Sequence, residues 1–132
     1  MIVVDKPKFR MAIYEAKKEV HVQILGFVRE ELVPEYVSDL QATIARVNNQ
    51  QAYTFVVDAT YQSPLPAKVA TDLGQTMLVY TTFGFPKIKI ILPKSKISYV
   101  QVRNAILEVD FPGELYFQDG TLFTKEEMYR KG

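Results

Sequence analysis

A group of polar residues follows a strongly apolar run in the middle of the chain. The run is Phe-Val-Val at 55–57, whose β-branched and aromatic character is typical of a buried strand. Ligands of open α/β sheets gather at the carboxyl ends of strands, and the N-terminus of a following helix offers free N–H groups to an anion. The sequence therefore predicts a partner-binding or phosphorylation loop here, with the candidate residues Asp58, Thr60, Tyr61, Ser63 and Lys68. The alternative is that Asp58 and Thr60 only cap and shape the turn.

The residue types that most often carry catalysis are scarce. His21 is the only histidine, and the chain has no cysteine. A catalytic triad needs a histidine beside a nucleophile, and a zinc site needs several histidine or cysteine ligands. Glu30, Glu31 and Glu35 crowd the start of a predicted helix, where the helix dipole alone favours negative charge. No glycine-rich phosphate-binding motif occurs, so we expect a protein that is not an enzyme and has no metal and no cofactor.

The composition is that of one globular domain. Of the 132 residues, 48% are hydrophobic and 23% are charged. The 16 Lys and Arg residues against 15 Asp and Glu leave a net charge of +1, without the basic excess that is usual for nucleic-acid-binding proteins. No apolar run is long enough for a membrane span, and the charged start of the chain is unlike a secretory signal. We expect a cytoplasmic single domain over residues 1–132, with 1–8 as a short N-terminal extension.

Periodicity predicts the first three elements. Within 9–16, Phe9, Met11 and Ile13 face one way, and residues 20–27 alternate in the same manner, which indicates an antiparallel hairpin. Apolar residues then recur at steps of three and four from Tyr36 to Val47, which is typical of one buried face of a helix.

The later elements alternate between strand and helix. Strands are predicted at 52–59, 87–92 and 115–117, and helices at 66–82, 95–109 and 124–131. Thr124 and Glu127 form a capping-box pair at the start of the last helix, whereas Gly74 weakens the second helix by about 1 kcal/mol relative to alanine. The order β-β-α-β-α-β-α-β-α implies an α/β fold, with a mixed, mostly parallel sheet opened by an N-terminal antiparallel hairpin. Its central strand, 52–59, is expected to be covered on both faces.

This order of elements resembles the STAS domain, the module of anti-sigma-factor antagonists and of sulfate-transporter tails. The matching segments are Leu25-Gly26 at a strand end, Phe55-Val56-Val57-Asp58, and Phe117-Gln118-Asp119 before the last helix. The resemblance spans residues 9 to 130.

The resemblance also implies a site, from which this chain departs. In STAS antagonists the loop after this strand carries a phosphorylated Ser or Thr, in an Asp-Ser-Ser-Gly type of motif at the helix start. Here the corresponding stretch is Ser63-Pro64-Leu65-Pro66-Ala67, without a hydroxyl at the helix start and without a glycine. Phosphorylation of Thr60 or Ser63 stays an alternative to a purely structural loop.

Two surface features favour a binding function. Lys87, Lys89, Lys94 and Lys96 form either a small basic patch or ordinary protection of a sheet edge. Aromatic residues crowd the end of the second helix, at 80–85, where any exposed part would suit a protein partner, self-association or a lipid.

The function expected from these features is protein interaction. We expect a STAS-like module that docks a protein partner through the loop 59–66 and the exposed face of the second helix. The alternative is a small-ligand or lipid-binding protein, with an apolar pocket between the sheet and the second and third helices.

Overall fold

The computed structural model describes residues 1–26, 29–124 and 126–127. Within them, seven strands form one mixed sheet in which neighbours in sequence are neighbours in space. The strands are β1 (Ile2–Asp5), β2 (Phe9–Tyr14), β3 (Glu19–Gly26), β4 (Thr54–Gln62), β5 (Lys87–Ile91), β6 (Glu114–Tyr116) and β7 (Leu122–Phe123). The helices are α1 (Val33–Ala45), α2 (Ala67–Tyr80) and α3 (Lys96–Val109), with short 3-10 turns η1 (Glu30–Leu32), η2 (Gln50–Ala52) and η3 (Thr81–Phe83). The predicted mixed α/β architecture is confirmed.

The N-terminal hairpin has the predicted pairing. β2 and β3 run antiparallel from Phe9 opposite Ile24 to Tyr14 opposite Glu19. The reversal at 15–18 closes with Lys18 in the left-handed region at φ 56°, which replaces the Asn-Gly type of turn that such hairpins favour.

Residues 1–8 contain a strand that the sequence does not predict. β1 pairs antiparallel with β2, and the register shifts between Ile2 and Val4. This irregularity breaks the alternation of faces, so the segment carries no period of two to reveal it. The segment is also tied to α1, because the Lys6 ammonium lies 2.6 Å from both the Glu35 and the Asp39 carboxylates. The two carboxylates raise the Lys6 pKa through their hydrogen bonds, Asp39 first.

The parallel part of the sheet follows the predicted order with two changes. β4, β5 and β6 run parallel to β3, and β7 adds an antiparallel edge strand beside β6. β4 continues to Gln62, three residues beyond its predicted end. Its pairing with β3 is irregular there, because two residues of β4 stand opposite one residue of β3 between the pairs Gln23–Asp58 and Leu25–Tyr61. The predicted last helix, 124–131, lies largely outside the described residues, although the Glu127 N–H does donate to the Thr124 hydroxyl at 3.4 Å.

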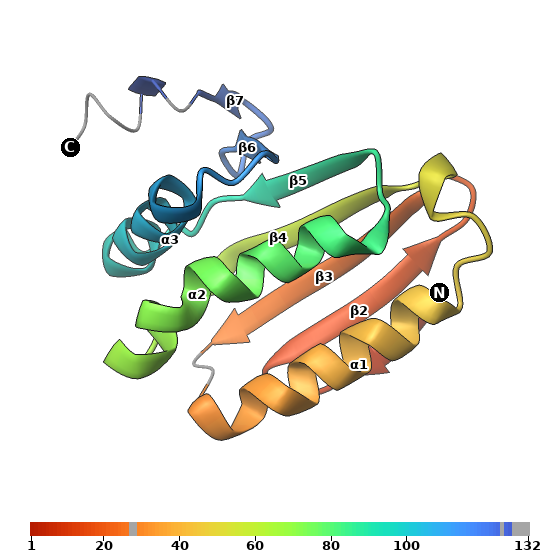
Figure 1. Ribbon diagram of the computed structural model, residues 1–132, viewed down its shortest axis with the longest axis horizontal. Coiled ribbons are helices and arrows are strands. Elements are labelled where there is room, and N and C mark those ends of the chain that lie inside the picture. Colours follow the sequence, from red (N-terminus) through yellow and green to blue (C-terminus); the bar gives the residue numbers. More distant parts are fainter. Residues whose placement is uncertain (27–28, 125, 128–132) are drawn as a thin grey trace.

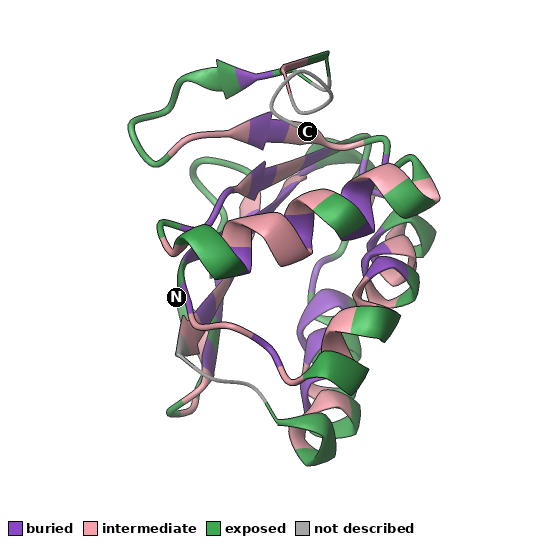
Figure 2. Cartoon of the chain, turned by 90° about the vertical axis from the view of Figure 1, so that its left-hand side faces the viewer, coloured by how far each residue is buried: buried purple, intermediate pink, exposed green. Residues whose placement is uncertain are grey.

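All three helices lie on one side of the sheet (Figure 1). Among the described residues no helix covers the other side, and Figure 2 shows α1 and α2 as a layer beside the sheet, with α3 running crosswise in front. The strand predicted at 52–59 is therefore covered by helices on one face only, although its apolar run is buried on both. Phe55 and Val57 face the helices and the core, whereas Val56 lies on the helix-free face and is still only 4% exposed. Asp58, which follows the run, lines a hollow on that face.

The lysines of β5 lie on this helix-free face as well. β5 is an interior strand between β4 and β6, so protection of a sheet edge does not explain them. The Lys87 ammonium instead lies 3.2 Å from the Glu114 carboxylate, and the Lys89 ammonium lies 5.3 Å from the centre of the Tyr116 ring. Both lysines are thus engaged with β6 rather than gathered into a free basic patch.

Spacing between the helices is uneven. α2 packs closely against α3, whereas the backbones of α1 and α2 stay further apart. Gly74 lies at the close approach, where a Cβ atom would come within 2.9 Å of Val109 Cγ1 and 3.4 Å of the Ala105 carbonyl oxygen. The glycine therefore allows the α2–α3 contact, which offsets its low helix propensity. No comparable backbone contact closes the space between α1 and α2.

Candidate functional site

The predicted loop residues Asp58 and Thr60 stabilise the backbone of β4 through hydrogen bonds to each other. The Asp58 carboxylate accepts hydrogen bonds from the Thr60 N–H at 3.0 Å and from the Thr60 hydroxyl at 2.5 Å. Thr60 is buried, with 8% of its surface exposed. These contacts shape the irregular stretch of β4, which favours the structural alternative for both residues and leaves the Thr60 hydroxyl poorly placed for phosphorylation.

The other three predicted residues point to different surroundings. Tyr61 is 58% exposed, and the Lys94 ammonium lies 5.7 Å from the centre of its ring. Ser63 is half-buried, and the exposed Lys68 lies 2.8 Å from a Glu30 carboxylate oxygen, which raises the Lys68 pKa. The five predicted residues therefore lie toward the carboxyl end of β4 and the start of α2, without forming one pocket.

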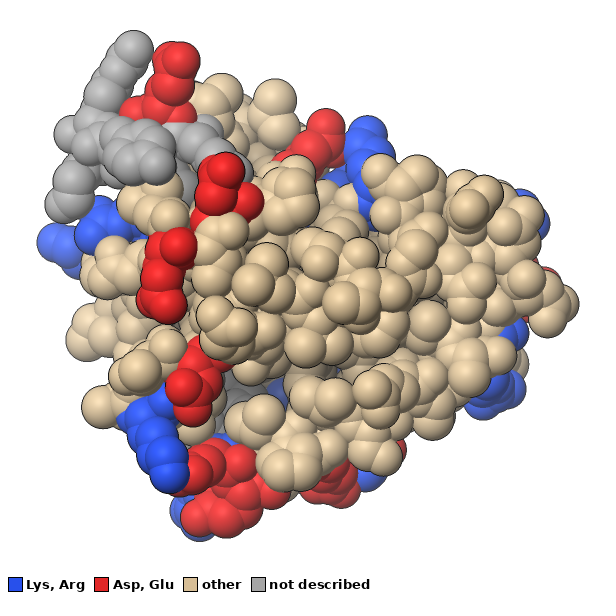
Figure 3. Space-filling model, viewed as in Figure 1, with Lys and Arg blue, Asp and Glu red and all other residues tan. Residues whose placement is uncertain are grey.

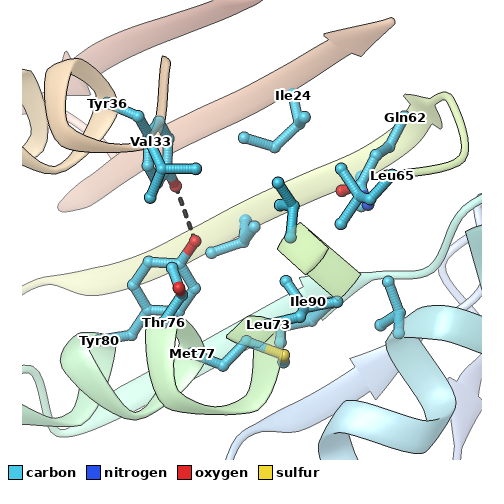
Figure 4. A pocket seen from close by; sticks show the side chains of 14 residues that line it. Ile24, Val33, Tyr36, Gln62, Leu65, Leu73, Thr76, Met77, Tyr80 and Ile90 are labelled. Atoms are coloured by element: carbon cyan, nitrogen blue, oxygen red, sulfur yellow. Dashed lines mark hydrogen bonds between the residues drawn. The ribbon is translucent and has the colours of Figure 1, made fainter. Parts of the chain in front are cut away.

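An apolar cavity lies where α1 and α2 fail to meet. It measures about 70 Å³ and sits between these two helices and the sheet. The second and third helices bound the pocket expected from sequence, whereas here α1 supplies one wall and α3 only Val102. The lining residues are Ile24, Val33, Tyr36, Val57, Ala59, Gln62, Leu65, Val69, Leu73, Thr76, Met77, Tyr80, Ile90 and Val102. Figure 4 shows the cavity with Gln62 and Leu65 at one end and Tyr36 and Tyr80 at the other.

Two buried tyrosines close the end of the cavity opposite Gln62 (Figure 4). The hydroxyls of Tyr36 on α1 and Tyr80 on α2 are 2.7 Å apart and share a hydrogen bond (Figure 4). Burial raises the pKa of Tyr36 well above its usual range and that of Tyr80 to about 12, because an apolar surrounding disfavours the phenolate. The pair is a neutral polar bridge between two helices that otherwise stand apart.

Gln62 provides the polar group at the other end. It is the last residue of β4, is 6% exposed and lines the cavity. Its amide nitrogen is buried and has no hydrogen-bond partner among the residues that the structure describes. Buried polar groups are nearly always hydrogen-bonded, so this amide is a donor in need of an acceptor.

Sequence reasoning misses this cavity for a physical reason. Tyr36 in α1 and Met77 and Tyr80 in α2 each belong to an apolar stripe at helical spacing. The same spacing is expected whether these side chains fill the core or line a cavity beside it. Gln62 precedes Pro64 and Pro66 and is taken as a loop residue, although the strand continues through it. A polar residue at the carboxyl end of a buried strand was the one available signal.

The remaining candidates for chemistry are accounted for by local contacts. His21 lies on the helix-free face, where its ring nitrogen is 2.9 Å from a Glu19 carboxylate oxygen and its ring meets that of Tyr14 edge-on at 5.0 Å. The hydrogen bond from His21 lowers the pKa of Glu19. Across the described part of the chain, no three His, Asp or Glu side chains gather closely enough to hold a metal ion. Nor does any described helix have the length and apolar character needed to span a membrane.

The layers and strand order define the SpoIIAA-like fold, which is the fold of STAS domains. A crystal structure of an uncharacterised protein of the DUF3478 family from Shewanella loihica PV-4, described as having a SpoIIAA-like fold, superimposes with a TM-score of 0.57. The two chains are 16% identical, and the match covers 98% of this chain and 97% of the other. At this identity the likeness concerns the fold alone. Models of protein families and curated proteins give no match to the sequence.

Proposed function

We propose that this chain is a non-catalytic binding protein that holds a small, mostly apolar molecule between the sheet, α1 and α2. The observation that supports this proposal is the apolar cavity, which has polar groups only at its two ends. Ligand sites of proteins are typically concave, mostly apolar and equipped with a few well-placed polar groups.

The size of the cavity limits the ligand. An engineered cavity of about 150 Å³ accepts benzene with its six carbon atoms, so a space of about 70 Å³ accommodates about three carbons. A larger body requires α1 to move away from α2, which breaks the Tyr36–Tyr80 hydrogen bond but no close backbone packing.

Filling the cavity is expected to abolish binding of a small apolar probe. Ala59 is buried and lines the cavity, so Ala59→Leu adds three carbon atoms to the space. We expect propan-1-ol to shift the amide NMR signals of cavity residues saturably in the wild-type protein and not in this variant. With about four non-hydrogen atoms, this probe gains at most roughly 1–6 kcal/mol, so the titration extends through the millimolar range.

Two further variants make this test decisive. Thr76→Leu fills the same cavity from a half-buried helical position, where a larger side chain is more easily tolerated. Ala42→Leu adds the same bulk at an exposed position of α1 outside the cavity and should leave binding unchanged. Equal probe binding in all four proteins, or no saturable binding to the wild type, would show that the cavity is not a ligand site.

Docking of a protein partner is the second candidate function, supported by a different surface. Tyr61 is largely exposed beside Lys94, and tyrosine is enriched among residues that dominate protein interfaces. Residues 73–86, in the second half of α2 and beyond, include no charged residue, and the helical side of the molecule shows a broad uncharged middle (Figure 3). Tyr61 belongs to the loop 59–66 and the uncharged stretch to α2, the two parts of the predicted docking surface, and they face opposite sides of the sheet.

Self-association is the form of docking that can be tested without another protein. If a second copy occupies the part of this surface around Tyr61, sedimentation velocity should show a mass that rises with concentration, and Tyr61→Ala should weaken the dimer about 10-fold. Tyr14→Ala removes another exposed tyrosine, on the helix-free face, and should have no such effect. A constant monomeric mass up to high concentration would contradict self-association through Tyr61.

A further inference from the structure

We infer that the molecule held in the α1–α2 cavity carries a carboxylate, bound at the Gln62 end with its aliphatic body directed toward Tyr36 and Tyr80. This inference rests on the proposed ligand-binding function and specifies its chemistry. It combines two independent features of the same end of the cavity, namely the unpartnered Gln62 amide and the N-terminus of α2.

The Gln62 amide nitrogen has no hydrogen-bond acceptor among the described residues. Its nitrogen carries two N–H donors and is buried without a partner. A water molecule held in place needs two to four polar partners, but the neighbouring lining residues at this end, Leu65, Val69 and Ile24, are aliphatic. An oxygen acceptor attached to an apolar body satisfies the amide and fills the apolar space at once.

The N-terminus of α2 favours a negatively charged acceptor. α2 has 14 residues, and its N-cap residue is Pro66, which makes no side-chain capping hydrogen bond. The first backbone N–H groups of a helix have no partner within the helix, and together with the helix dipole they attract anions. Leu65, which lies beside Gln62 at this end of the cavity (Figure 4), comes two residues before the first residue of α2, so α2 begins near the same end.

The charged side chains beside this end of the cavity carry both signs in equal number, because the exposed Arg29 and Glu31 flank Glu30 in sequence. Lys68, in the first turn of α2, pairs with Glu30 at 2.8 Å, and both side chains are largely exposed. This pair joins the segment before α1 to α2 beside lining residues Val33 and Val69. Because Lys68 offsets the charge of Glu30, this carboxylate does not repel an entering anion. The N–H donors of Gln62 and of the start of α2 then decide which charge of ligand the site prefers.

The experiment compares three probes that share a three-carbon body and therefore match the size of the cavity. Propanoate, propan-1-ol and propylammonium are titrated into the full chain, and binding is followed by amide NMR shifts of the cavity residues. We expect propanoate to bind about 10-fold more tightly than propan-1-ol and propylammonium to bind most weakly. Gln62→Leu should remove the advantage of propanoate and leave propan-1-ol binding within about twofold of wild type.

A control variant and a stability measurement separate binding from folding. Gln41→Leu makes the same change at an exposed position of α1 outside the cavity and should keep the propanoate preference. Gln62→Leu should unfold at the same or a higher temperature than wild type, because an unpartnered buried amide is replaced by an apolar side chain of similar size.

The outcomes distinguish this inference from the function on which it rests. If propan-1-ol binds in the cavity and propanoate binds no better, or if Gln62→Leu keeps the preference for propanoate, the carboxylate inference is wrong and the apolar-ligand proposal stands. If none of the three probes binds, the proposed function itself is wrong. Tightest binding of propylammonium would also overturn the inference, because it would assign a cation to this end of the cavity.

Discussion

Replacing Phe55 by alanine is expected to lower the free energy of unfolding by about 3–5 kcal/mol, the largest effect of any substitution considered. Phe55 is fully buried in β4, between Val20 of β3 and Ile88 of β5. Its ring stacks on Phe85 at 5.3 Å and meets Tyr80 edge-on at 5.2 Å. Truncation therefore removes both the buried ring and the packing partner of the segment that ends α2. Equilibrium unfolding in urea measures the change.

A matched control lies on the same strand. Tyr61 is also a large aromatic residue of β4 but is mostly exposed, so Tyr61→Ala should change stability by no more than about 0.5 kcal/mol. A loss below about 1 kcal/mol for Phe55→Ala, or equal losses for the two variants, would contradict a core centred on Phe55.

The second large effect concerns alkaline pH. Tyr36 and Tyr80 have folded-state pKa values above their usual value, in the case of Tyr80 about 12 instead of 10.0. Above pH 10 the unfolded chain loses these protons while the folded chain keeps them, so the unfolded state is favoured as the pH rises. Their stabilising effect is complete below pH 10. The contribution of Tyr80 is lost between about pH 10 and 12, and that of Tyr36 is lost as the pH rises through its own raised pKa. For Tyr80 alone a shift of this size corresponds to roughly 3 kcal/mol.

Comparison with phenylalanine variants isolates this contribution. The double variant Tyr36→Phe, Tyr80→Phe should lose stability less steeply between pH 10 and 12 than the wild type, because neither ring can ionise. At neutral pH it should be less stable by about 1 kcal/mol or less, since both partners of one hydrogen bond are removed together. Urea unfolding at a series of pH values gives both quantities. Parallel stability curves for the two proteins above pH 10 would show that the tyrosine pair is not buried as described.

The elements with regular periodicity are the ones that the sequence predicts well. The faces of the 9–14 and 19–26 strands follow from alternation, and the three described helices follow from apolar residues at steps of three and four. The STAS-like order of elements, taken as a whole, is confirmed by the SpoIIAA-like fold. β1 is missed because its irregular pairing near Ile2 and Val4 erases the alternation that marks a strand.

The site is less predictable than the fold because it depends on a distance between helices. The spacing of Tyr36 and Tyr80 within their own helices predicts that both are buried, but only the assembled structure shows that their hydroxyls meet across a gap. The predicted pair Asp58 and Thr60 is recovered as a local contact, because residues two positions apart interact whatever the rest of the fold does. Partner docking and phosphorylation of the loop stay predictions.

The extra residue that β4 accommodates near Thr60 has a genetic consequence. Val57 and Ala59 both line the cavity, so a regular strand would turn Tyr61 to the same side and Gln62 away from it. The irregular pairing reverses this, leaving Tyr61 exposed and Gln62 buried. Deleting the codon of the extra residue would make the strand regular and would still leave Tyr61 exposed and Gln62 in the cavity, because the residue and the irregularity disappear together. Inserting one further residue would instead turn Tyr61 into the cavity and Gln62 toward solvent, which would fill the space with an aromatic ring.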